Sequence, residues 1–205
     1  LQFIGKEIKP TKITVLLTGF HLDNLGGTGC LLQHQIPVYG SNRTCQLLDE
    51  RSAQTQKLML TWLQKPEHEK YRKAYAEKYQ FYSYESQKRF PNETTKNNQI
   101  QSELEDILET RDSFEVYFPG ESHSPDNLTV YIKELNLLFG GCMIKSIESP
   151  NLGFTGDANM SEWPISVRKV QAKYPDAQLV IPHHGKWGDI SLLQHTLDLF
   201  QNQKQ

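Results

Sequence analysis

The sequence predicts an α/β fold, and three stretches carry this prediction. The apolar, β-branched run Ile13–Leu17 is followed by a glycine-containing loop, a short helical segment and the strand-like Pro37–Tyr39. A strand, a helix and a strand with short links are typical of a parallel βαβ unit. Alternating apolar and polar residues over 114–144 indicate antiparallel strands, and a helix, strand, helix order follows from Ser161 onward.

The length of the chain favours one domain, and its net charge gives no general electrostatic attraction to nucleic acids or anionic membranes. The chain has 205 residues and a net charge of −2, so we assign 1–205 to a single domain and expect neither nucleic acid nor membrane as a partner. No apolar run is long enough to span a bilayer. The chain begins with Leu1 rather than Met, so we expect that an N-terminal part is missing and that the lack of a signal peptide is uninformative.

The first forty residues are predicted in order as a helix end, a strand, a loop, a helix and a strand. Leu1–Lys9 reads as the end of a helix that Pro10 stops. The first strand is expected over Lys12–Thr18 and the following helix over Thr28–Gln35. The loop between them, Gly19–Gly27, follows the carboxyl end of a strand, which is where α/β folds place their chemistry.

A polar helical insertion is predicted from 42 to 111, because this segment is rich in Lys, Glu, Gln and Tyr. Leucines at patchy helical spacing end near Leu63, and Pro66 breaks the pattern. Tyrosines then form one helical stripe within Glu67–Tyr84. We favour a helical hairpin that packs this stripe over a lid on a substrate cleft. A polar loop is expected over Pro91–Asn98 and a short helix over Gln99–Glu109.

The remainder is predicted as a β meander followed by a helix, a strand and a helix. The meander has strands near 114–118, 128–132 and 137–144, with a hairpin turn at 133–136. Ser161 is the expected N-cap of a helix that reaches Tyr174, and Asp189 that of the last helix. A strand over Gln178–Ile181 lies between these two helices.

The three cysteines do not make a closed disulfide framework, because their number is odd. A Cys30–Cys45 disulfide in an oxidising compartment is one interpretation. We favour two small buried side chains, which is the commoner state of free cysteine.

Four loops at strand ends carry residues that bind metal ions. They contribute His21 and Asp23, His123, Cys142, and His183 with His184. Imidazole, carboxylate and thiolate are the ligands that zinc prefers. One His-x-Asp pair is more often a hydrogen-bonded loop pair than a metal site. Four such loops on alternating elements instead favour a metal centre.

The motifs in these loops resemble those of the metallo-β-lactamases, in particular the subclass whose second zinc is bound by Asp, Cys and His. The similarity extends in order from Lys12 to about Phe200. The matching motifs are the following: His21–Gly27, Pro119–Asn127, Phe139–Lys145, Gly156–Asn159 and Ile181–Gly185. The resemblance implies an αββα sandwich whose N-terminal strands are missing from this chain, and a periplasmic or secreted bacterial enzyme.

Carried over position by position, the resemblance implies the ligand set. Asp23, Cys142 and His184 match the second zinc site, with the cysteine bound as thiolate. His21 and His123 match two of the three ligands of the first site. We interpret His183 as a neighbour of the site, because adjacent residues of an extended strand face different ways.

The resemblance also implies the roles of other residues. Asp23 and His123 would act in catalysis. Lys145 would hold the substrate carboxylate by a charge-assisted contact, and Asn24 and Phe154 lie at further substrate-binding positions. Asp157 matches an aspartate that holds the site loops.

Gly19 departs from the family pattern, because it stands where the family has the third histidine of the first zinc site. We therefore expect one tightly bound zinc, with the site at His21 and His123 weak or absent. The leading interpretation is a zinc-dependent β-lactamase that hydrolyses the lactam amide of antibiotics such as carbapenems. The alternatives are a hydrolase of thioesters or phosphodiesters, and a catalytically impaired or repurposed binding protein.

Overall fold

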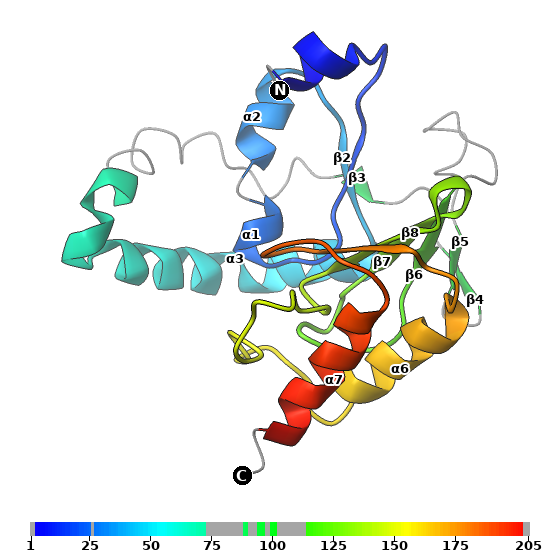
Figure 1. Cartoon of the computed structure of the whole chain (residues 1–205). Helices are drawn as coiled ribbons and strands as arrows, with labels where there is room; N and C mark the ends of the chain where they lie inside the picture. The colour runs from blue at the N-terminus through cyan, green and yellow to red at the C-terminus, as the bar shows by residue number, and fades with distance from the viewer. Residues whose placement is uncertain are drawn as a thin grey trace. The chain divides into compact units, whose positions relative to one another are not determined.

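The computed structural model describes residues 3–25, 27–72, 88–89, 94–96, 99–101 and 114–202. Figure 1 shows the whole chain, which divides into two compact units. The first unit comprises Leu1–Leu17 and Leu22–Arg89, and the second comprises Thr18–His21 and Phe90–Gln205. The assignment of 1–205 to a single domain stays a prediction.

The first unit contains the parallel strands that the βαβ pattern predicts. Its sheet has the order β1 (Val15–Leu16), β2 (Val38–Gly40) and β3 (Lys88–Arg89), with parallel neighbours. Short helices α1 (Leu22–Leu25) and α2 (Thr28–Gln33) lie between β1 and β2 in the sequence. Strand β1 is shorter than the seven-residue strand that the apolar run predicts. A one-turn π-helix, η1 (Ile4–Ile8), stands where a helix end is expected.

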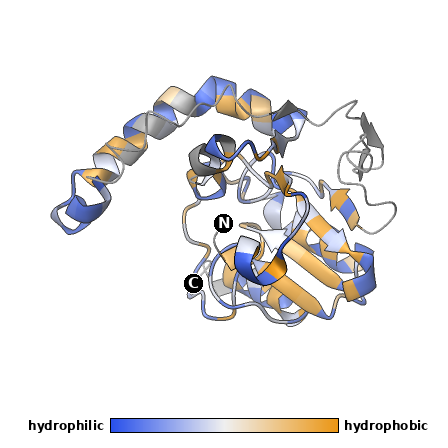
Figure 2. Ribbon diagram, turned by 90° about the horizontal axis from the view of Figure 1, so that it is seen from above, coloured by the Kyte–Doolittle hydropathy of each residue, from blue (hydrophilic) through white to orange (hydrophobic). Residues whose placement is uncertain are grey.

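The predicted insertion begins with one long helix, α3 (Asn42–Leu63). Ser41 caps it, because its Oγ accepts a hydrogen bond from the Thr44 backbone N–H at 3.0 Å. Figure 2 shows hydrophilic and hydrophobic residues mixed along this helix. The short helix η2 (Pro66–His68) follows with Pro66 in its first turn, so the break at this proline is confirmed. Most of the tyrosine stripe lies outside the described residues.

The second unit contains a six-stranded sheet in sequential order. All neighbours pair antiparallel except β8 and β9, which are parallel. Its strands are β4 (Thr94–Lys96), β5 (Gln99–Gln101), β6 (Phe114–Tyr117), β7 (Thr129–Ile132), β8 (Leu137–Gly141) and β9 (Leu179–Pro182).

Strands β4 and β5 correct two sequence predictions. The polar loop expected over Pro91–Asn98 contains β4, and the helix expected over Gln99–Glu109 begins instead as β5. Gln99 of β5 pairs with Tyr117 of β6, so the open edge of the meander provides hydrogen-bond partners for this polar segment. Sheet pairing overrides local helix preference where such an edge is available.

The meander itself is confirmed. Val116 of β6 lies opposite Val130 of β7, and Tyr131 of β7 lies opposite Leu138 of β8. A 3₁₀ turn, η5 (Lys133–Leu135), joins β7 to β8 and ends at Asn136 with φ 45°. Asn tolerates this left-handed conformation better than most residues.

Two helices contribute to the core of the second unit. Helices α6 (Trp163–Lys173) and α7 (Ser191–Asn202) lie side by side in Figure 1 and contact each other. Asn159, not the predicted Ser161, accepts a hydrogen bond from the Glu162 backbone N–H at the start of α6. Asp189 accepts one from the Ser191 N–H before α7, as expected of a capping residue. The buried core of this unit is apolar and aromatic: Tyr117, Leu138, Met143, Ile144, Leu152, Trp163, Val167, Val170, Tyr174, Ala177, Val180, Leu192, Leu193, Leu197 and Leu199.

The interpretation of Cys45 as a small buried side chain is confirmed. Its thiol lies 3.7 Å from the carbonyl oxygen of Gly40. The side chain of Cys30 lies outside the described residues. Among the helices that are described, none is both long and apolar enough to cross a membrane.

Candidate metal centre

The carboxyl ends of the parallel strands β8 and β9 bring a thiol and two imidazoles together. Cys142 directly follows β8 and is buried. His183 and His184 directly follow β9. The backbone N–H of His183 donates to the carbonyl oxygen of Gly141 at 3.1 Å, which ties the two strand ends together. Parallel strands deliver their carboxyl ends to one edge of a sheet, which explains this convergence.

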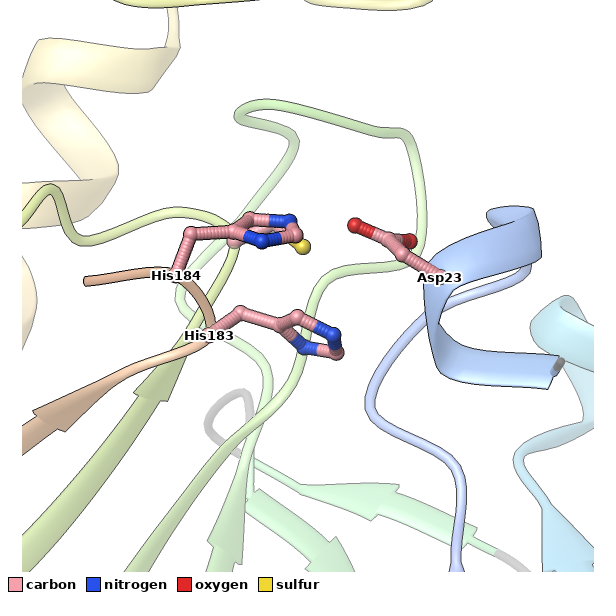
Figure 3. Close-up of side chains that lie close together, drawn as sticks. Asp23, His183 and His184 are labelled. Atoms are coloured by element: carbon pink, nitrogen blue, oxygen red, sulfur yellow. The ribbon is translucent and has the colours of Figure 1, made fainter. Parts of the chain in front are cut away.

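One possible ligand atom from each of Cys142, His183 and His184 lies within 4.8 Å of the others. The centroids of the two imidazole rings are 4.7 Å apart, and both rings are drawn in Figure 3. A thiolate and two imidazoles form a donor set that suits zinc, so the residues present fit the metal that the sequence predicts.

His183 lies close to Cys142 and His184, although the alternation of adjacent strand residues predicts that it faces away from them. Alternation of facing holds only within an extended strand. Strand β9 ends at Pro182, and Gly185 has φ 81°, so the backbone has left the extended conformation around the two histidines. Both side chains can therefore approach Cys142.

His21 and His123 also lie together in the second unit. Their ring centroids are 5.0 Å apart and nearly perpendicular. Nε2 of His21 donates to Oδ2 of Asp157 at 3.0 Å. This hydrogen bond fixes the ring tautomer and leaves Nδ1 of His21 for a metal ion. The predicted role of Asp157 as the holder of a site loop agrees with this contact.

Trp163 contacts several parts of the site, and sequence reasoning missed it. Its side chain is fully buried, and its Nε1 donates to the carbonyl oxygen of Met143 at 2.9 Å. The His123 ring packs against the indole edge to face, with centroids 5.2 Å apart. The Lys145 ammonium lies 5.2 Å from the indole centroid, within cation–π range. The only sequence signal was an aromatic residue at the start of a helix.

Lys145 lines a pocket together with two members of the thiol and imidazole group. The pocket has a volume of about 230 Å³, and its walls comprise Cys142, Ile144, Lys145, Ser149, Pro150, Asn151, Gly153 and His184. The backbone N–H of Lys145 donates to Oγ1 of Thr196 in α7 at 2.8 Å, and Thr196 is fully buried. This hydrogen bond fixes the backbone from which the lysine side chain extends.

Phe154 is an exposed aromatic residue beside His21. Its side chain is 59% exposed, and its ring packs against that of His21 with centroids 5.9 Å apart. A large exposed aromatic side chain beside a site histidine is available to contact a bound molecule.

A second set of polar contacts joins the loop after Lys145 to the loop after His184. Oγ of Ser146 accepts a hydrogen bond from the backbone N–H of Lys186 at 3.1 Å. The Lys186 ammonium and the Glu148 carboxylate form an ion pair at 2.6 Å. The hydrogen bond and the charge of Lys186 lower the pKa of Glu148, and Glu148 in turn raises the pKa of Lys186. Both side chains are exposed, so this ion pair adds little stability.

Asp23 and Asn24 belong to the first unit. Asp23 lies in the first turn of α1, as Figure 3 shows, and its Oδ1 accepts hydrogen bonds from the backbone and side-chain N–H groups of Asn24 at 3.0 and 3.3 Å. Their participation in the metal centre stays a prediction. Gly19 is buried, and it is not among the described glycines with positive φ.

Curated proteins similar to this chain are metallo-β-lactamases. A type 2 metallo-β-lactamase from Elizabethkingia meningoseptica is 42% identical over 95 residues, which are 46% of this chain and 38% of that protein. One from Bacillus sp. strain 170 is 44% identical over 87 residues, or 42% of this chain and 34% of that protein. These matches therefore span little more than a third of the curated relatives. No family model matches the chain.

Solved structures extend the similarity over nearly the whole chain. A metallo-β-lactamase from Pontibacter korlensis has a TM-score of 0.67 and 32% identity, and the match covers 98% of this chain and 75% of that one. The structure of VMB-1 at pH 5.5 has a TM-score of 0.69 and 32% identity, covering 100% of this chain and 75% of that one. The predicted fold class is thereby confirmed, and the chain belongs to the metallo-β-lactamases.

Proposed function

We propose that the protein is a zinc-dependent hydrolase that opens the amide of β-lactam antibiotics, carbapenems among them. The observation that carries this proposal is the meeting of Cys142 and His184 at the wall of a pocket that Lys145 also lines. Thiolate and imidazole supply the metal ligands, and a lysine ammonium supplies a partner for a carboxylate, the acidic group of a β-lactam.

The metal would be held by Cys142, His184 and the Asp23 carboxylate, which the family resemblance adds from the first unit. A zinc ion supplies positive charge that stabilises the negative charge developing as an amide bond breaks. Zinc is the one cofactor that the proposal requires. A weak second site would involve His21 and His123, because Gly19 provides no third side-chain ligand.

The remaining residues would bind and orient the substrate. The Lys145 ammonium would hold the substrate carboxylate, and Phe154 and Asn24 would contact the rest of the molecule. His123 or Asp23 would accept the proton of the attacking water. The fixed Lys145 backbone supports a rigid position for the bound ring. We place the enzyme in the periplasm or outside the cell, by family resemblance alone.

Turnover of nitrocefin and imipenem, measured together with bound zinc, tests the proposal. Cys142→Ser should abolish activity and tight zinc binding, because a hydroxyl is a far poorer zinc ligand than a thiolate. Cys45→Ser is the matched control, since it makes the same change at a buried thiol beside the carbonyl of Gly40. Full turnover and one tightly held zinc in Cys142→Ser would disprove the metal assignment.

Gly19 favours one alternative, a relative that binds zinc or β-lactams without hydrolysing them. Its position provides no side chain for the first zinc site. Zinc retention and β-lactam binding without turnover of either substrate would establish this alternative in place of hydrolysis.

A further inference from the structure

We propose that His183 is a direct ligand of the metal ion held by Cys142 and His184. The proposal rests on the proposed metal site, and it adds a ligand for which neither the family motif nor the sequence pattern provides. Under this proposal, the two adjacent histidines after β9 both bind the same metal ion.

The first step of the argument is the position of the side chain. A ligand atom of His183 lies within 4.8 Å of Sγ of Cys142 and of a ring nitrogen of His184. Zinc bonds of 2.0–2.3 Å in a tetrahedral arrangement separate neighbouring ligand atoms by about 3.3 to 3.8 Å. The three atoms therefore need to approach by no more than about 1 to 1.5 Å, which small rotations of the side chains provide.

The second step is the backbone. The hydrogen bond from the His183 N–H to the Gly141 carbonyl, at 3.1 Å, holds His183 beside the residue that precedes Cys142. On the other side, Gly185 has φ 81°, and a Cβ atom there would lie only 2.6 Å from Cβ of Ser146. The segment that carries both histidines is thus anchored on the Cys142 side and closely packed beyond His184.

The third step is chemical. Cys142 is buried, and His183 is partly buried, so both donors are shielded from bulk water. Thiolate and two imidazoles are three protein ligands, the number that catalytic zinc sites use. All three lie in the second unit. Asp23 would make a fourth ligand in the proposed site, and zinc can expand to five-coordinate when a reacting molecule binds.

Metal titration of four variants tests the proposal. Zinc affinity is measured against a chromophoric chelator, and cobalt(II) replaces zinc for absorption spectra. His183→Gln should weaken zinc binding at least tenfold, because loss of even an outer contact of a ligand weakens binding 10–100-fold. It should also change the cobalt ligand-field bands while the thiolate charge-transfer band remains. His34→Ala is the control, since it removes an exposed imidazole of the first unit.

Cys142→Ser and His184→Ala separate the two proposals. If both lose tight zinc binding but His183→Gln keeps the wild-type affinity and spectrum, His183 is not a ligand and the proposed function stands. If both keep wild-type affinity, the proposed metal site itself is wrong, and the inference fails with it.

Wild-type protein provides a measurement that does not depend on the folding of a variant. In protein loaded with cadmium-113, NMR detects scalar coupling between the metal and the ring nuclei of its imidazole ligands. Coupling to the rings of both His183 and His184 is the expected result. Coupling to His184 alone would overturn the proposal.

Discussion

At the scale of single residues, Trp163 connects the most parts of the site. It donates to the Met143 carbonyl, packs against His123 and lies beside the Lys145 ammonium. Met143 is fully buried, so its carbonyl has no access to solvent when the indole donor is removed. The indole thus stabilises the segment after Cys142 and also contacts the side chains of His123 and Lys145.

Trp163→Phe should lower the free energy of unfolding by about 1 to 3 kcal/mol, the usual effect of leaving a buried polar group without its partner. Urea unfolding measures the change. Trp187→Phe is the control, because Trp187 is 69% exposed and such surface changes fall within about 0.5 kcal/mol. Equal stability of the two variants would show that the Met143 contact is unimportant.

Lys145→Ala should raise KM for β-lactams more than it lowers kcat. A lysine–carboxylate contact exists in the ground and transition states alike, so it contributes mostly uniform binding. Hydrogen bonds to charged groups contribute about 1.5 to 3 kcal/mol, which corresponds to a loss of roughly ten- to a hundredfold in kcat/KM. Steady-state kinetics decide, with the exposed Lys133→Ala as control. An unchanged KM for every β-lactam tried would remove Lys145 from the substrate site.

At the scale of elements, helix α7 supports the pocket through one side chain. Oγ1 of Thr196 donates to the Leu192 carbonyl at 2.8 Å and accepts the hydrogen bond from the Lys145 N–H. The helix therefore fixes a residue 51 positions earlier in the chain. An amphipathic pattern predicts the helix but gives no sign of this contact.

Thr196→Val keeps the shape of the side chain and removes both hydrogen bonds. We expect it to lower the free energy of unfolding by about 1 to 3 kcal/mol and to raise KM through the loosened Lys145. Thr61→Val is a matched control, because Thr61 makes the same bond to the carbonyl four residues earlier, at 2.9 Å, on the exposed face of α3. If thermal unfolding and KM change equally in both variants, the contact with Lys145 has no effect.

Regular elements were predicted well where the pattern is local. The βαβ unit, the meander and the last two helices follow from periodicity and caps, since these signals lie within the segment itself. Strand β5 was missed because its polar sequence pairs with β6, which is distant along the chain, and β4 was missed with it because β4 pairs with β5. The family motifs predicted Cys142 and His184, and the alternation of adjacent residues predicted that His183 is only a neighbour of the site. The structure places a ring nitrogen of His183 within 4.8 Å of ligand atoms of both, because β9 ends at Pro182 and the regular alternation ends with it.

At the scale of the whole molecule, we expect the number of bound zinc ions to depend on Gly19. We expect one tightly bound zinc in the wild type and two in Gly19→His, because His21 and His123 already lie together. Gly19 is not among the described glycines with positive φ, so a histidine at this position would not be strained by a left-handed backbone conformation.

Mass spectrometry of the native protein counts the metal ions. Gly5→His is the control, since a Cβ at Gly5 meets nothing within 4 Å and Gly5 belongs to the first unit. Two zinc ions already bound with Gly19 would contradict the one-zinc expectation. No gain in Gly19→His would mean that more than one residue impairs the first site.

The proposed metal site at the carboxyl ends of β8 and β9 would also link the lifetime of the protein to the supply of metal. The donors that follow these strands are brought together by folding, so an ion that they hold favours the folded chain by mass action. Free zinc at a hundred times the dissociation constant adds about 2.7 kcal/mol to stability. Under zinc starvation, the second unit would then open more often and be degraded faster. The proposed hydrolytic activity would then decline through loss of the protein as well as through loss of the metal ion.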